Sequence, residues 1–153
     1  MPKFKLSRIL VPPIWFLLAG LLMLALDRYA PGARLLSLPW TWLGILPVGL
    51  GVGLAVWAAR LFRARETPIE PWATPSAFVA DGPYRFTRNP MYLGLALSLF
   101  GLAVCLGSAT PLLVIPAFVW VITVRHIRPE ESRLTALFGG DFTAYKARVR
   151  RWI

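Results

Sequence analysis

Four apolar stretches separated by polar connections run along the chain. A helix needs about 20 apolar residues to cross the bilayer core, and the last two stretches are somewhat shorter than this. Each stretch contains few charged residues, so the pattern predicts an all-α, integral membrane helical bundle of about four transmembrane helices. The expected spans cover about residues 9–26, 41–62, 90–107 and 110–125.

The connection between the third and fourth stretches is very short. Residues 107–110 carry no charge, and Pro111 suits the first turn of the helix that follows. We therefore expect a tight helical hairpin here. Glycines would allow close backbone approach between helices, and the candidates are Gly49, Gly51 and Gly53 in the second stretch and Gly94, Gly101 and Gly107 in or after the third.

Two polar regions flank this hairpin. Residues 64–89 contain Pro68, Pro71, Pro75 and Pro83, which make a long regular helix there unfavourable, so a functional loop is expected. After the fourth stretch, Pro129 suits the first turn of a short cytoplasmic helix, and Gly139-Gly140 should end that helix. A second short helix should then cover about residues 141–150.

Composition supports a membrane protein. Hydrophobic residues make up 57% of the 153 residues, and the mean hydropathy is +0.60. A soluble domain has a lower apolar share, so the chain is expected to form one membrane-embedded domain, residues 1–153. The formal net charge is +10, but the basic residues lie beside the spans, which favours a membrane surface over nucleic acid as partner.

The distribution of basic residues predicts the orientation. Fifteen of the seventeen lie before the first span, between the second and third, or after the fourth, and only Arg28 and Arg34 lie in the other connections. Because basic loops stay in the cytoplasm, both termini should be cytoplasmic. Richness in Arg, Ala, Leu and Pro suggests a prokaryotic inner membrane. One cysteine, Cys105, and one histidine, His126, do not support a metal site.

Charged and aromatic residues gather in two segments at the ends of the hairpin, on one side of the bilayer. By themselves these segments are compatible with a capped membrane helix and with acidic residues at a helix's positive end. The first segment runs from Gly82 to Gly94 and contains Pro83, Tyr84, Arg88, Asn89, Pro90 and Tyr92. The second contains Glu130-Glu131, Leu134, Phe138-Gly139, Asp141, Tyr145-Lys146 and Val149.

Together the two segments resemble the membrane-embedded methyltransferases of the isoprenylcysteine carboxyl methyltransferase and phospholipid N-methyltransferase group. The resemblance covers about residues 66–151 and implies S-adenosyl-L-methionine as methyl donor. It also implies a lipophilic acceptor, either an isoprenoid-linked carboxylate or thiol or a phospholipid amine. Family members often have His where this chain has Asn89, so a role that needs an imidazole there is lost, whereas a helix cap is not.

The resemblance also implies roles for individual residues. Arg88, beside the start of a helix at Asn89-Pro90, would hold the cofactor carboxylate. One of Glu130 and Glu131 would bind the ribose hydroxyls or the ammonium group, while the other pairs with an arginine. The implied cofactor-binding residues are Gly82, Pro83, Tyr84, Arg88, Asn89, Pro90, Tyr92, Gly94, Glu130 and Glu131, and the segment 128–151 would cap the cofactor.

Methyl transfer requires alignment of the reactants and, for some acceptors, removal of a proton. The candidate catalytic residues are Glu131, Arg125 and His126, although His126 is also compatible with an interfacial polar residue. Trp72, in the proline-rich loop, would border the opening for the acceptor.

Two other function classes share parts of the pattern. A non-catalytic membrane protein that binds lipid or a partner would need the spans and the basic face, but neither motif. A reductase similar to the sterol reductases would need a nicotinamide site, and the sequence contains no dinucleotide glycine fingerprint.

Overall fold

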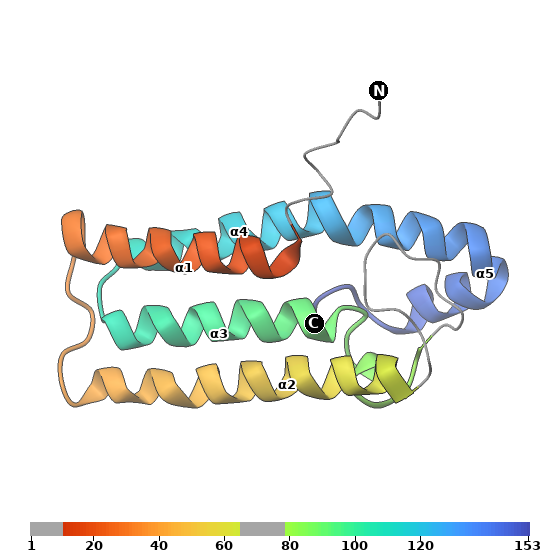
Figure 1. The fold of residues 1–153 in the computed structure, drawn as a ribbon, viewed down its shortest axis with the longest axis horizontal. Helices are drawn as coiled ribbons and strands as arrows, with labels where there is room; N and C mark the ends of the chain where they lie inside the picture. The colour runs from red at the N-terminus through yellow and green to blue at the C-terminus, as the bar shows by residue number, and fades with distance from the viewer. Residues whose placement is uncertain (1–10, 65–78) are drawn as a thin grey trace, which may run out of the picture.

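The computed structural model describes residues 11–64 and 79–153, and within them the chain folds as an antiparallel helical bundle (Figure 1). Short 3-10 turns precede α2, α3 and α4, at Trp40–Gly44, Gly82–Arg85 and Thr110–Leu113. The all-α membrane bundle expected from the sequence is confirmed. Its helices are α1 (Pro12–Tyr29), α2 (Ile45–Ala64), α3 (Pro90–Leu106), α4 (Val114–Ile122) and α5 (Arg128–Arg148).

One helical path runs from Thr110 to Arg148, over 39 residues. A π-helical turn, Thr123–Ile127, joins α4 to α5, so the separate helix expected to begin at Pro129 is instead a continuation. The wider turn lies just before Pro129. A proline inside a regular α-helix removes one backbone hydrogen bond, and the proline ring crowds the preceding turn. The break expected at Gly139-Gly140 is present as a kink at Gly139, with φ 51° and ψ −119°.

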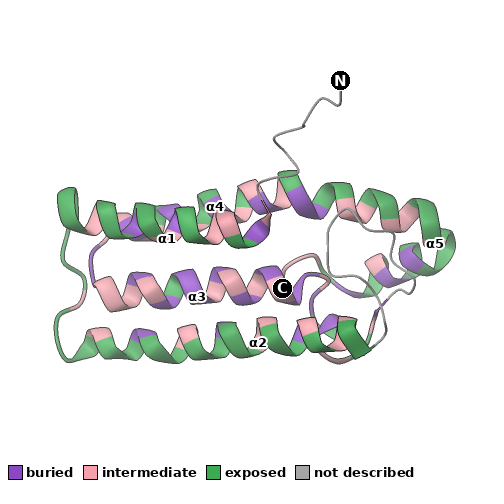
Figure 2. Ribbon diagram, in the orientation of Figure 1, coloured by how far each residue is buried: buried purple, intermediate pink, exposed green. Residues whose placement is uncertain are grey.

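Three helical segments of the described chain are long and apolar enough to cross a membrane: Pro12–Tyr29, Trp40–Ala64 and the apolar part of Thr110–Arg148. The shorter α3 has 17 residues and lies between α2 on one side and α1 and α4 on the other (Figure 1). Figure 2 shows that α3 is the most buried of the helices, whereas the outer helices are largely exposed. Their exposed side chains, such as Leu21 on α1, Leu46 on α2 and Trp120 on α4, form an apolar surface suited to lipid.

Small residues allow α2 and α3 to pack closely. A Cβ atom added to Gly94 would meet the Gly51 carbonyl oxygen, and one added to Gly101 would lie 2.6 Å from the Gly44 carbonyl oxygen. The expected close approach is therefore present, but the helix that meets α3 here is α2 rather than its hairpin partner α4. Gly49 and Gly53 have no atom within 4 Å of an added Cβ, so these two glycines do not contribute.

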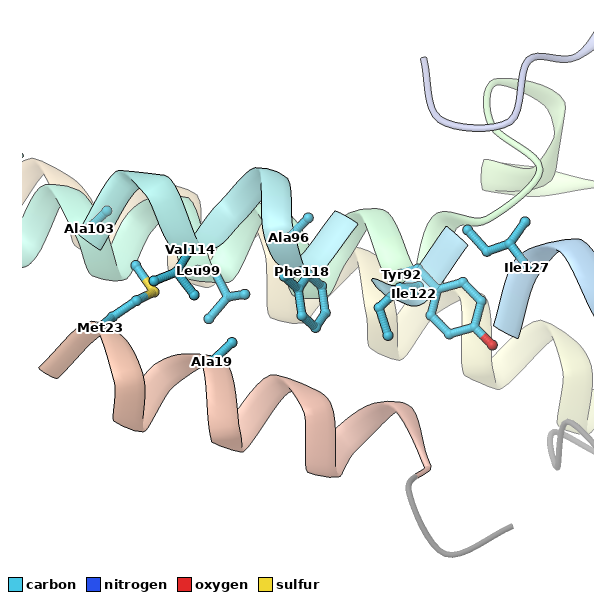
Figure 3. Packing of buried hydrophobic residues seen from close by; sticks show 10 residues of the cluster. All are labelled: Ala19, Met23, Tyr92, Ala96, Leu99, Ala103, Val114, Phe118, Ile122 and Ile127. Carbon is cyan, nitrogen blue, oxygen red and sulfur yellow. The ribbon is translucent and has the colours of Figure 1, made fainter. Parts of the chain in front are cut away.

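The main apolar core lies between α1, α3 and α4 (Figure 3). On α3 the members of this cluster recur every three or four residues, so one stripe of the helix faces the core. The members of this cluster are Ala19, Met23, Tyr92, Ala96, Leu99, Ala103, Val114, Phe118, Ile122 and Ile127.

Polar contacts close the end of the bundle opposite the two motif segments. Gly107 ends α3 with φ 76°, and its carbonyl oxygen accepts hydrogen bonds from the backbone N–H groups of Leu35 and Leu36. The Arg34 guanidinium donates to the Leu106 carbonyl oxygen at 2.8 Å. These bonds tie the connection between α1 and α2 to the hairpin turn.

Candidate functional site

The two motif segments meet at one end of the bundle. The Tyr145 hydroxyl donates to the Tyr84 carbonyl oxygen at 2.6 Å, and Nη2 of Arg88 lies 3.2 Å from Oε1 of Glu131. In Figure 1 this end contains the end of α2, the start of α3 and the whole of α5. The structure thus brings together residues about 40 to 60 positions apart, namely Tyr84 with Tyr145 and Arg88 with Glu131.

Glu131 is bound by two arginines at once. The Arg151 guanidinium donates from Nε to Oε1 at 3.1 Å and from Nη2 to Oε2 at 2.6 Å, a two-point contact. The side chains of Arg88 and Glu131 are only 12% and 13% exposed, and that of Arg151 is 34% exposed. We call these three residues the charged cluster. With two guanidinium groups and one carboxylate it carries a net charge of +1, and this charge favours an anionic ligand group.

Asn89 occupies the residue before α3, and Pro90 lies in the first turn as expected. The expected side-chain cap is absent, because Asn89 Nδ2 donates instead to the Arg151 carbonyl oxygen at 2.9 Å. Thr87 donates to the same carbonyl oxygen at 3.2 Å. Asn89 therefore joins α3 to the residues that follow α5 rather than capping its own helix.

Glu130 faces a different environment from Glu131. Its Oε2 atom accepts a hydrogen bond from the Tyr92 hydroxyl at 3.4 Å. Loss of hydration raises the pKa of Glu130 to about 7, although the bond from Tyr92 and the charge of Arg133 act in the opposite direction. A carboxyl group with this pKa can take up or release a proton near neutral pH.

The two adjacent basic candidates differ in their surroundings. His126 is 9% exposed, its ring centroid lies 6.5 Å from that of Tyr92, and its Nε2 atom is buried without a hydrogen-bond partner among the described residues. Arg125 is exposed. The structure therefore brings His126, but not Arg125, next to the pair of Tyr92 and Glu130.

Tyr84 lies on the α2 side of the site. Its ring packs against Phe62 with centroids 5.4 Å apart, and its hydroxyl is buried without a hydrogen-bond partner in the described part of the chain. Burial, with the nearby charge of Glu130, raises the pKa of Tyr84, so its hydroxyl stays protonated and can donate to a ligand.

The small members of the first motif have packing contacts. Gly82 has φ 57°, and a Cβ atom added there would lie 2.7 Å from Leu61 Cδ1. Pro83 is buried, and Gly94 lies at the α2–α3 contact described above. These three residues have no polar side chain to offer a ligand, and their role shown here is in packing. Trp72 lies outside the described residues.

The segment 128–151 was expected to cap the cofactor, but the sequence predicted no individual role for Arg151. Residues 149–152 fold back against the start of α3, and we call them the return segment. Its Arg151 completes the charged cluster, and its Trp152 Nε1 donates to Thr123 Oγ1 at 3.2 Å. In the sequence, Arg150 and Arg151 have the same pattern as any basic residues beside a span, so no local signal distinguishes them.

Three buried polar atoms at this end of the bundle lack a hydrogen-bond partner among the described residues: Tyr84 Oη, Arg88 Nε and His126 Nε2. Buried polar groups are rarely left unpaired, so a polar ligand is a natural partner for them. Within residues 11–64 and 79–153 there is no group of three acidic, histidine or cysteine side chains able to hold a metal ion.

A comparison with known families identifies the chain. The phospholipid methyltransferase family matches residues 39–141, from just before the 3-10 turn at Trp40–Gly44 into α5. The chain belongs to the phospholipid methyltransferase family. The resemblance seen in the motifs is thus confirmed. Arg88, Glu130 and Glu131 lie in the matched part, whereas Tyr145 and the return segment follow it.

Two relatives give more detail. A fission yeast (Schizosaccharomyces pombe) protein-S-isoprenylcysteine O-methyltransferase is 30% identical over 71 residues, which are 46% of this chain and 30% of the yeast protein. An uncharacterized protein of Haemophilus influenzae is 38% identical over 63 residues, 41% of this chain and the whole of that protein. The matched region thus spans less than a third of the yeast enzyme's length. No solved structure gives a significant match.

Proposed function

We propose that this chain is an S-adenosyl-L-methionine-dependent methyltransferase that acts on an acceptor dissolved in the membrane. The observation that carries the proposal is the charged cluster, in which Arg88 from the first motif and Glu131 from the second lie 3.2 Å apart. Membership of the phospholipid methyltransferase family supports the reaction class.

The residues present fit the methyl donor. Arg88, with a buried and unpartnered Nε atom in a cluster of net positive charge, would hold the carboxylate. Glu130 would hold the ammonium or the ribose hydroxyls, because Glu131 already pairs with two arginines. Tyr84 and Tyr92 would flank the adenine. When bound, the cofactor supplies a methyl group that its positive sulfur has already activated.

The chain must then remove a proton from some acceptors and exclude water. His126 Nε2 is buried and unpaired, so it is free to accept a proton from a thiol or an amine at the membrane boundary. Tyr92 and Glu130 lie next to it and form a second proton-carrying pair. The α5 helix packs its Phe142 and Tyr145 over this end of the bundle, where they limit access of water.

The acceptor should be a lipid or another lipophilic molecule. The outer faces of α1, α2 and α4 are apolar and exposed, so an acceptor reaches the site from the bilayer. The chemical possibilities are an isoprenoid-linked carboxylate or thiol and a phospholipid amine. Trp72 stays a sequence-based candidate for the border of the acceptor opening. The site should face the cytoplasm of a prokaryotic inner membrane, with both termini on that side.

The deciding experiment uses the purified protein in lipid nanodiscs. S-adenosyl-L-methionine carrying a labelled methyl group is supplied with a total lipid extract, and the labelled product is identified by mass spectrometry. Titration with the cofactor and with a reduced nicotinamide is run in parallel. Saturable binding of S-adenosyl-L-methionine together with a labelled lipid supports the proposal. Nicotinamide binding alone would favour a reductase, and binding of neither would favour a non-catalytic protein.

A further inference from the structure

We infer that the return segment, residues 149–152, positions the cofactor-binding groups, and that Arg151 is the positioning residue through which it acts on Glu131. This inference rests on the proposed function. It concerns residues that follow the region matched by the family, which ends at residue 141.

The backbone of the return segment binds the first motif. The Arg150 carbonyl oxygen accepts the Arg88 backbone N–H at 2.9 Å. The next carbonyl oxygen, that of Arg151, accepts bonds from Asn89 Nδ2 at 2.9 Å and from Thr87 Oγ1 at 3.2 Å. Three consecutive residues before α3 are thus bound to two consecutive carbonyl groups, so the position of Arg88 depends on the return segment.

The side chains of the return segment bind the second motif and the core. Arg151 holds both oxygens of Glu131, which fixes the rotation of the carboxylate. Trp152 is anchored by its bond to Thr123 and by packing against the main core cluster. At the other end Val149 packs with Phe142 and Tyr145 of α5. The segment is therefore held at both ends and cannot shift without breaking several contacts.

Arg151 also changes the net charge that surrounds a ligand bound at Arg88. Without Arg151, the negative charge of Glu131 would be balanced by Arg88 alone, and the pair would be neutral. With Arg151 in place, Glu131 is held by a two-point contact and the charged cluster keeps a net charge of +1, which favours an incoming carboxylate beside Arg88. Arg151 thereby raises cofactor affinity while contacting Glu131 rather than the cofactor.

The test measures S-adenosyl-L-methionine affinity by calorimetry on the full chain in nanodiscs, for wild type, Arg151→Ala, Glu131→Gln and the double variant. Arg148→Ala, an exposed arginine on α5, is the matched control. We expect Arg151→Ala to weaken binding roughly tenfold, and Arg148→Ala to leave it unchanged. Because Arg151 acts through Glu131, its replacement should add little further loss in the Glu131→Gln background.

Thermal unfolding of each variant separates positioning from folding. Arg151→Lys keeps the charge but not the two-point contact, so it should fold normally and still lose several-fold in affinity, which keeps the test decisive if Arg151→Ala unfolds. If Arg151→Ala lowered cofactor affinity equally in the wild-type and Glu131→Gln backgrounds, Arg151 would contact the ligand directly. If a folded Arg151 variant kept the wild-type affinity, Arg151 would have no positioning role. Either result overturns the inference. Failure of the wild type to bind the cofactor would overturn the proposed function itself and this inference with it.

Discussion

The hydroxyl of Tyr145 donates a hydrogen bond of 2.6 Å to the main-chain carbonyl oxygen of Tyr84, and both residues are buried. This bond joins the first motif to the far end of α5. Burial raises the pKa of Tyr145 to about 12, so the hydroxyl remains a donor at all physiological pH values.

Tyr145→Phe should therefore destabilise the fold by about 1–2 kcal/mol, because it removes one buried bond and leaves the Tyr84 carbonyl oxygen unpaired. The measurement is thermal or denaturant unfolding in detergent. Tyr29→Phe is the matched control, since Tyr29 is 83% exposed at the opposite end of the bundle. Equal stability of the two variants would mean that the bond contributes nothing measurable.

Glu130 should make stability depend on pH. Its pKa is about 7 in the folded chain against an ordinary value of 4.5, so the folded state binds the proton more tightly than the unfolded state does. The stabilisation is fully present below pH 4.5 and is lost as pH rises through 7, with an upper limit of about 3 kcal/mol.

Unfolding of wild type and Glu130→Gln between pH 5 and 8 tests this directly. The wild type should lose stability relative to the variant as pH rises, because the glutamine stays neutral throughout. Asp141→Asn, a change at an exposed carboxylate on α5, controls for net charge. A difference between wild type and Glu130→Gln that stays constant over this range would contradict the burial of a neutral carboxyl group.

Gly94→Ala should destabilise the bundle by about 1–3 kcal/mol, because overpacking forces tightly packed backbones apart. The added methyl group would meet the Gly51 carbonyl oxygen and lie 3.0 Å from Ala55 Cβ on α2. Gly53→Ala makes the same change where nothing lies within 4 Å, and it should cause no loss. The comparison is made by thermal unfolding, and a matching loss in both variants would argue against the close α2–α3 contact.

Arg88→Ala should weaken binding of S-adenosyl-L-methionine roughly tenfold or more, since one charged hydrogen bond to the ligand is worth about 1.5–3 kcal/mol. Arg85→Ala is the matched control, because Arg85 is exposed three residues earlier. Calorimetry on folded protein provides the comparison. If the two variants bound alike, Arg88 would serve only to pair with Glu131.

Topology can be tested by cysteine labelling of intact cells. In a Cys105→Ser background, Leu38→Cys places a thiol in the connection before α2, where Leu38 is 73% exposed, and Arg148→Cys places one at the end of α5. An impermeant maleimide should label the first in intact cells and the second only after permeabilisation. Labelling of Arg148→Cys in intact cells would reverse the proposed orientation.

Much of the site could be predicted, but the contacts within it could not. Arg88, Glu130 and Glu131 were found because their motif strings are specific, and the structure brings both motifs to one end of the bundle. Arg151 was missed, although it is the closest partner of Glu131. Its side chain becomes part of the cluster only because residues 149–152 turn back toward α3, and no periodic pattern predicts such a turn.

The placement of the spans followed from composition, because a bilayer excludes charged groups and leaves long apolar stretches visible in any sequence. The pairing of helices did not. By their spacing, Gly94 and Gly101 could have faced α4 or α2 equally well. In the fold they face Gly51 of α2 and Gly44 of the 3-10 turn before it, which also lack side chains. The different surroundings of Glu130 and Glu131, which are adjacent in sequence, could not be predicted from the sequence either. One carboxylate is half-buried beside Tyr92 and the other is held by two arginines, because successive residues on a helix point about 100° apart and so meet different neighbours.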